Sequence, residues 1–126
     1  MEEAEGLASR EILEANADLE ERLSRLSFSV SYDEEFDIFV LTIGEPTEAI
    51  TEEVADGLQL RLDPETLKVV GFEVLSFRRR FLPAHPEFGP HFESLFESPI
   101  QRRDIPPRGA QHRRAQEVAS KLAAVS

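Results

Sequence analysis

The sequence lacks cysteine and tryptophan, and its 126 residues include a single tyrosine and a single methionine. Without cysteine there can be no disulfide framework, no thiolate nucleophile and no zinc site built from cysteine ligands. Long hydrophobic runs are also missing, because no apolar stretch approaches the roughly 18 residues of a membrane-spanning helix. The first residues lack the basic and apolar regions of a secretory signal. We therefore expect a cytoplasmic protein that does not enter a membrane.

Basic residues are scarce in the first part of the chain. Residues 1–77 contain 5 basic residues against 20 acidic ones, whereas residues 78–126 contain 9 against 5, and the formal net charge is −11. Because an acidic body repels phosphate groups, nucleic acid is an unfavourable partner despite the arginines of the second part. We expect those arginines to contact an acidic protein surface, either in this chain or in a second copy.

Hydrophobic periodicity predicts one helix followed by a sheet. Residues 9–26 place apolar side chains three or four positions apart, which is typical of an amphipathic helix. Four strands are predicted within residues 28–77, joined by polar turns such as 33–35 and 63–66. The acidic segment 48–57 is expected to be irregular. The sequence thus predicts an α+β fold with a four-stranded antiparallel β-meander and an N-terminal amphipathic helix.

The composition changes after residue 77. An aromatic segment at 81–98 is punctuated by prolines, and residues 99–109 are typical of an extended linker. A further short amphipathic helix is predicted behind that linker. We therefore predict a single α+β domain with short C-terminal helices over residues 1–98, followed over residues 99–126 by a linker and a short helix or tail.

Short motifs within residues 28–77 are shared with a known family. They are Tyr32-Asp33 with Asp37 after the first strand, the sequence EVADG at 53–57, Asp63 at a turn, and VGFEVL at 70–75. In these motifs the chain resembles a bacterial and archaeal family known as domain of unknown function 2283. The resemblance implies a small antiparallel sheet with a helix and no established activity. Some family members lie beside small toxin-like genes, which implies an antitoxin-like or regulatory binding role.

Two groups of polar residues contain potential metal ligands. Asp33 and Asp37 in the acidic turn could bind Ca²⁺ or Mg²⁺ through oxygen, but their spacing differs from that of an EF-hand loop. His85 and His91 could bind zinc, but prolines and a glycine interrupt the helical spacing that histidine pairs use. We therefore expect no metal ion and no cofactor.

Recognisable catalytic motifs are also missing. The sequence contains no Ser–His–Asp order, no Gly-rich phosphate loop and no zinc-protease motif. Paired carboxylates need a pocket for acid–base chemistry, and a small four-stranded sheet offers little concavity. The sequence therefore favours a binding protein over an enzyme. The alternative is a protein that binds a small ligand or a divalent metal through its acidic turns.

The predicted strands are apolar on both faces. We predict that one face lies under the helix and contains Phe28, Val30, Tyr32, Leu58, Leu60, Leu62, Val70, Phe72 and Val74. The opposite face and the aromatic segment are predicted to form an interaction surface of Phe39, Leu41, Val69, Leu75, Phe77, Phe92 and Phe96. A contiguous apolar patch marks a binding surface. The predicted function is therefore a protein-interaction module, most simply a twofold homodimer or a binder of another protein.

Overall fold

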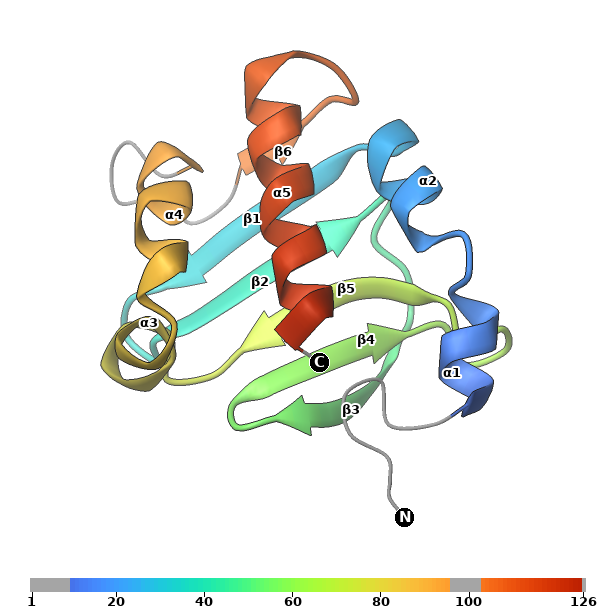
Figure 1. Cartoon of the computed structure of the whole chain (residues 1–126), viewed down its shortest axis with the longest axis horizontal. Helices are drawn as coiled ribbons and strands as arrows, with labels where there is room; N and C mark the ends of the chain where they lie inside the picture. Colours follow the sequence, from blue (N-terminus) through green and yellow to red (C-terminus); the bar gives the residue numbers. More distant parts are fainter. Residues whose placement is uncertain (1–9, 96–102, 126) are drawn as a thin grey trace.

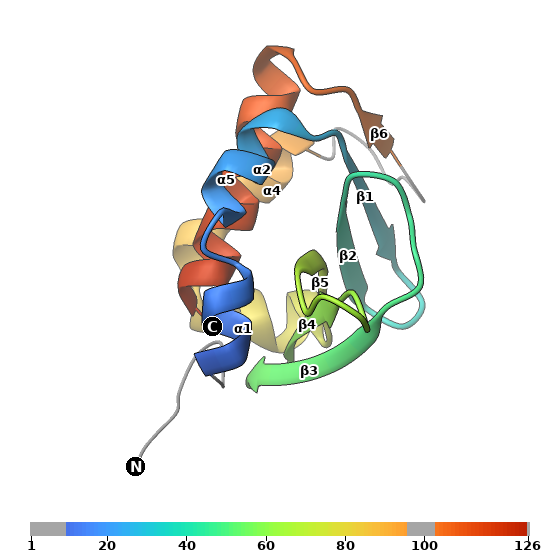
Figure 2. The same ribbon diagram turned by 90° about the vertical axis from the view of Figure 1, so that its right-hand side faces the viewer.

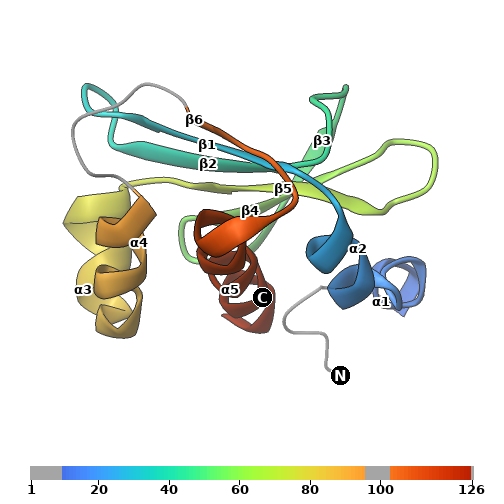
Figure 3. The ribbon, with the colours of Figure 1, turned by 90° about the horizontal axis from the view of Figure 1, so that it is seen from above.

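The computed structural model describes residues 10–95 and 103–125, and in these residues the helices all lie on one face of an antiparallel sheet (Figures 1 and 3). The strands are β1 (Phe28–Asp33), β2 (Ile38–Ile43), β3 (Ile50–Ala55), β4 (Leu58–Leu62), β5 (Val69–Val74) and β6 (Arg103–Ile105). Their order in the sheet is β3-β4-β5-β2-β1-β6. The predicted α+β class and the antiparallel sheet are therefore confirmed, but the predicted number of strands is wrong, since the sheet has six strands and not four.

Helices come from both ends of the chain. They are α1 (Arg10–Ala15), α2 (Leu19–Arg25), α3 (Leu82–Ala84), α4 (Gly89–Leu95) and α5 (Gly109–Val125). A π-helical turn, η1 (Phe77–Phe81), and a 3-10 turn, η2 (Pro86–Phe88), lie between β5 and α4. Within the described ranges, no helix is both long and apolar enough to cross a membrane.

The two strands that the sequence did not predict are the edges of the sheet. β3 pairs with β4 from Ile50 opposite Leu62, although its next residues, Thr51, Glu52 and Glu53, are polar and exposed. An edge strand needs no second apolar neighbour, and charged side chains are common there. β6 lies in the predicted linker and pairs with β1, where its Ile105 is buried opposite Phe28.

One hydrophobic core lies between the sheet and the helices, and α5 belongs to it. Ala115, Val118, Ala119 and Leu122 on α5 are fully buried. This helix packs against α2 and α4, and Figure 1 shows it lying across the middle of the sheet. The predicted boundary at residue 98 therefore does not separate two structural units, because the apolar stripe of α5 completes the core of the domain.

The register of the strands shows which residues share a face. Leu41 of β2 lies directly opposite Val30 of β1 and Phe72 of β5. Because directly paired residues on antiparallel strands point to the same face, the odd-numbered residues of β2 face the same core as Val30 and Phe72. The prediction that Phe39 and Leu41 face away from this core is therefore wrong.

A bulge in β5 determines which of Val69 and Val70 faces the core, and here too the prediction is wrong. Leu62 pairs with Val69 while Arg61 pairs with Gly71, so Val70 is an extra residue in β5. An extra residue changes the phase of the side chains along a strand. Val69 is consequently buried and Val70 only half-buried, which reverses the predicted placement of these two residues.

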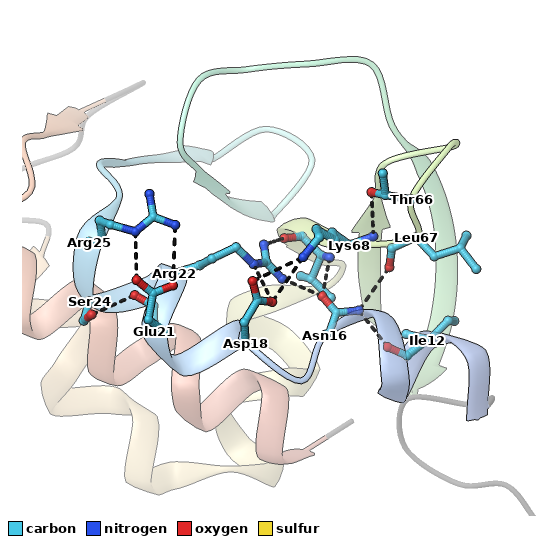
Figure 4. Close-up of polar contacts among 11 residues, drawn as sticks. Ile12, Asn16, Asp18, Glu21, Arg22, Ser24, Arg25, Thr66, Leu67 and Lys68 are labelled. Carbon is cyan, nitrogen blue, oxygen red and sulfur yellow. Dashed lines mark hydrogen bonds and ion pairs between the residues drawn. The ribbon is translucent and has the colours of Figure 1, made fainter.

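The predicted helix 9–26 is broken at residues 16–18 by a buried polar cluster (Figure 4). The side-chain amide of Asn16 donates to the carbonyls of Ile12 and Leu67, at 2.8 and 3.0 Å. Its oxygen accepts from the backbone N–H of Val69 and from Arg22, both at 2.7 Å. Arg22 also donates to the Val69 carbonyl at 2.9 Å. This cluster attaches the junction of α1 and α2 to the start of β5.

Candidate functional site

Most of the predicted interaction residues form the interior of the molecule. Phe39, Leu41, Val69, Phe77 and Phe92 are at most 3% exposed. The ring of Phe92 makes edge-to-face contacts with Phe39 and Phe77, at centroid distances of 4.6 and 4.4 Å. Phe39, Phe77 and Phe92 therefore attach the aromatic segment to the sheet within one chain, and none of the five side chains forms a surface patch.

The other two predicted interaction residues have different positions. Phe96 lies outside the residues that the structure describes. Leu75 is half-buried and follows β5, where it lines a cleft together with residues of η1 and α3. Among the predicted interaction residues that the structure describes, Leu75 is thus the one that lines a concave surface.

The sheet face opposite the helices has no covering element among the described residues (Figures 2 and 3). By register, this uncovered face consists of Ser29, Ser31, Ile38, Val40, Thr42, Thr51, Glu53, Gln59, Arg61, Glu73 and Asp104. Small hydroxyl side chains alternate here with a few aliphatic ones. An antiparallel sheet commonly has one such polar face.

A charged pair lies near the middle of the uncovered face. Arg61 Nη1 of β4 lies 3.7 Å from a carboxylate oxygen of Glu73 on β5. Gly71 makes this arrangement possible, because a Cβ atom there would lie 2.8 Å from the carbonyl oxygen of Leu41 and 3.3 Å from Cδ of Arg61. The absence of a side chain at residue 71 therefore lets β2, β4 and β5 lie close together and lets Arg61 reach Glu73.

Asp37, which was considered as a candidate metal ligand, forms hydrogen bonds within the protein. It is 5% exposed and adopts a left-handed backbone with φ of 58°. Its carboxylate accepts from the Tyr32 hydroxyl at 2.6 Å and from the amides of Arg78 and Arg79 at 2.9 and 3.1 Å. Burial raises the pKa of Asp37, but these three hydrogen bonds outweigh burial and hold the pKa below its usual value. Asp37 thus caps the start of η1.

Two neighbours of Asp37 also have structural roles. Asp33 accepts a hydrogen bond from the Phe36 amide at 3.1 Å and thereby closes the β1–β2 turn. Burial and the hydrogen bond to Asp37 raise the pKa of Tyr32 to about 12. The guanidinium of Arg78 lies 4.8 Å from the centre of the Tyr32 ring. Tyr32 therefore stays protonated at neutral pH and is no general base.

The two histidines considered as candidate zinc ligands, His85 and His91, lie on different segments and do not come together. His85 Nδ1 lies 3.9 Å from a carboxylate oxygen of Glu87, and its ring packs against Phe81. His91 Nδ1 lies 3.6 Å from a carboxylate oxygen of Glu117 and so connects α4 to α5. Within residues 10–95 and 103–125 there is no group of three or more side chains that could hold a metal ion.

A cleft of about 610 Å³ lies beside η1 at the end of β5. One side contains Glu53 of β3 and Asp56 of the β3–β4 turn, and the other contains Arg80 of η1 and His85, which directly follows α3. An ion pair between Arg80 and Asp56 connects the two sides. The proximity of Glu53 and Asp56 to Arg80 and His85 depends on the path of the chain after β5.

No family model matches the chain, and no curated protein or solved structure shows significant similarity to it. The resemblance to the family of domain of unknown function 2283 therefore stays a prediction.

Proposed function

We propose that the chain is a protein-interaction module that forms a twofold homodimer through the uncovered face of its sheet. The observation that carries this proposal is the one-sided placement of the helices. A six-stranded sheet has one face sealed by five helices and the other face bare in the described residues (Figure 3). A bare sheet face is broad and rigid, and it is suited to contact with an identical face.

Charge on the uncovered face supports pairing with a second copy. Arg61 lies between Glu73 of β5 and the edge strand β3, which contributes Glu53. A twofold axis through the face would let Arg61 of each subunit approach the acidic side chains of the other. Val40, on the central strand β2, would then provide apolar contact at the middle of the interface.

The size of the face sets the expected strength of the dimer. Six strands about 4.8 Å apart span about 24 Å, and strands of about five residues are about 17 Å long. The face therefore offers about 400 Å² per subunit, well below the ~800 Å² per partner of a standard stable interface. We accordingly expect a weak dimer, with a dissociation constant between about 10 μM and about 1 mM.

Sedimentation velocity over that concentration range tests the proposal. The wild-type average mass should rise from monomer toward dimer with concentration. Val40→Lys should stay monomeric throughout, because a cation at the centre of the face would meet its own symmetry mate. The matched control is Leu13→Lys, which introduces the same charge at an apolar residue that is 56% exposed on α1. A wild-type protein that is monomeric at every concentration contradicts the proposal, as does equal association of the two variants.

A further inference from the structure

The cleft at the end of β5 has walls of opposite charge. Glu53 lies on β3 and Asp56 on the β3–β4 turn, whereas Arg80 lies on η1 and His85 directly follows α3. Apolar lining comes from Leu75 and Phe81, which belong to the segment that connects the sheet to these helices. Its volume of about 610 Å³ falls within the range of roughly 300–1,000 Å³ that small-molecule sites occupy.

The charged groups of the cleft are accessible. The side chains of Arg80 and Asp56 are 68% and 74% exposed, although they form an ion pair. Ion pairs between side chains this exposed contribute little, so a ligand can replace either partner without a large penalty. The pair lies between the two walls and can exchange its contacts for those of a ligand.

The backbone beside the cleft departs from regular geometry. Ser76 adopts a left-handed conformation with φ of 50°, and the next five residues form the π-helical turn η1. Left-handed non-glycine residues and π-helical turns are both concentrated at functional sites in proteins. Here they place Arg80 opposite Asp56 and turn the chain so that His85 reaches the same cleft.

The combination of groups restricts the chemistry of a ligand. Phosphate would meet the two carboxylates of Glu53 and Asp56, and a polyamine would meet the guanidinium of Arg80. A ligand with one positive and one negative group satisfies both walls. An apolar group between these charges would contact Leu75 and Phe81.

We propose that this cleft binds a free α-amino acid with an apolar side chain. The ammonium group of the ligand binds Glu53 and Asp56, and its carboxylate binds Arg80 and His85. Its side chain packs against Leu75 and Phe81. This site shares Glu53 of β3 with the proposed dimer surface, whereas Asp56, Arg80 and His85 belong to the β3–β4 turn and to the segment after β5.

Titration of the full chain with three probes tests the proposal, with binding followed through the backbone amide signals of Gly57 and Ser76 in NMR spectra. Leucine carries both charges, leucinamide lacks the carboxylate, and N-acetylleucine lacks the ammonium group. Leucine should bind, and each analogue should bind at least about tenfold more weakly, because each loses one charge-assisted contact. If leucine does not bind, or if the analogues bind as well as leucine, the proposal is wrong.

Two variants test which wall of the cleft binds the carboxylate of leucine and which binds its ammonium group. Arg80→Gln should weaken leucine binding and reduce the preference for leucine over leucinamide, because His85 remains as a partner of the carboxylate. Asp56→Asn should weaken leucine binding and reduce the preference for leucine over N-acetylleucine, because Glu53 remains as a partner of the ammonium group. The matched control is Arg78→Gln on the same turn, because Arg78 lies over the Tyr32 ring and does not line the cleft. Preferences that are undiminished in both cleft variants would overturn the assignment. Val40→Lys should bind leucine normally, which separates this site from dimer formation.

Discussion

Asp37 shows how one side chain organises a region of the molecule. It lies at the end of the β1–β2 turn, where its carboxylate accepts a hydrogen bond from the nearby Tyr32 hydroxyl. It also accepts hydrogen bonds from two amides of η1, which lie some forty residues further along the chain. Its own carbonyl accepts from the Phe77 amide at 2.9 Å. The position of η1, and with it one wall of the cleft, therefore depends on this residue.

Replacing Asp37 by asparagine should lower the free energy of unfolding at pH 7 by about 1–3 kcal/mol, because one amide oxygen cannot replace two carboxylate oxygens that accept three hydrogen bonds. Asparagine tolerates a positive φ, so backbone strain does not explain the loss. Urea unfolding followed by circular dichroism measures it. Asp33→Asn, at an exposed turn residue, should change the value by less than about 0.5 kcal/mol.

The same variant should also change how stability depends on pH. The pKa of Asp37 is lower in the folded chain than its usual value of 3.8, so its ionised form stabilises the fold above that value. This contribution is lost as the pH falls through the folded-state pKa. The difference between wild type and Asp37→Asn should therefore be constant above about pH 5 and shrink below about pH 4. A difference that grows toward low pH would contradict this explanation.

At the scale of elements, the buried cluster around Asn16 determines how the N-terminal helices meet the sheet. Asn16 and Arg22 are each 7% exposed, and together they bind both the carbonyl and the amide of Val69. Val69 is the first residue of β5, next to the turn that follows β4. The position of both helices is thus connected to the bulged end of β5 through hydrogen bonds to the backbone.

Asn16→Ala should lower the free energy of unfolding by about 2–3 kcal/mol, because it leaves the Val69 amide without its acceptor and removes one partner of the buried Arg22. Thermal and urea unfolding measure the change. The control is Glu21→Ala, which removes an exposed ion pair with Arg25 on the same helix. Glu21→Ala should leave the unfolding midpoint nearly unchanged, and similar midpoints for both alanine variants would contradict the role of Asn16.

The sequence predicted elements correctly where side-chain periodicity alone decides them. β1 and β4 alternate between apolar and polar residues, β2 and β5 are short apolar runs, and all four strands were predicted. β3 was missed because an edge strand with Thr51, Glu52 and Glu53 has no apolar alternation to detect. The break at 16–18 was missed because it depends on hydrogen bonds from Asn16 to residues about fifty positions away.

The candidate site was less predictable than the fold. The apolar residues on both faces of β2 suggested a second hydrophobic surface, and only the pairing of Leu41 with Val30 and Phe72 shows which of them are core residues. The cleft was not predicted as a unit because its walls come from β3–β4 and from η1. Their proximity follows from the path of the chain at Ser76, which periodicity does not reveal.

At the scale of the whole molecule, helices from the two ends of the chain share one core. α5 packs between α2 and α4, and the Ser120 hydroxyl donates to Glu20 of α2 at 2.6 Å. His112 binds the carbonyl of Leu26 at 2.7 Å, next to the C-terminal end of α2. The described residues therefore form one structural unit, and α5 is as much a part of it as the sheet.

Leu122→Ala should accordingly destabilise the entire molecule by about 2–5 kcal/mol, since Leu122 is fully buried. Circular dichroism reports on all elements, and the fluorescence of Tyr32, the single tyrosine, reports on the far end of β1. Both probes should show the same lowered urea midpoint. Lys121→Ala, its exposed neighbour, should change stability by less than about 0.5 kcal/mol. A variant that alters only the circular dichroism transition would show that α5 unfolds separately.

The position of α5 also has a consequence for synthesis on the ribosome. The apolar face of β1, β2, β4 and β5 is complete once residue 74 has emerged, but the helix that covers its middle begins at Gly109 (Figure 1). Until α5 is available, the middle of this apolar face remains open to water and to other nascent chains. Stable folding therefore follows the synthesis of α5, and in this interval the chain is most exposed to aggregation and has most need of a chaperone.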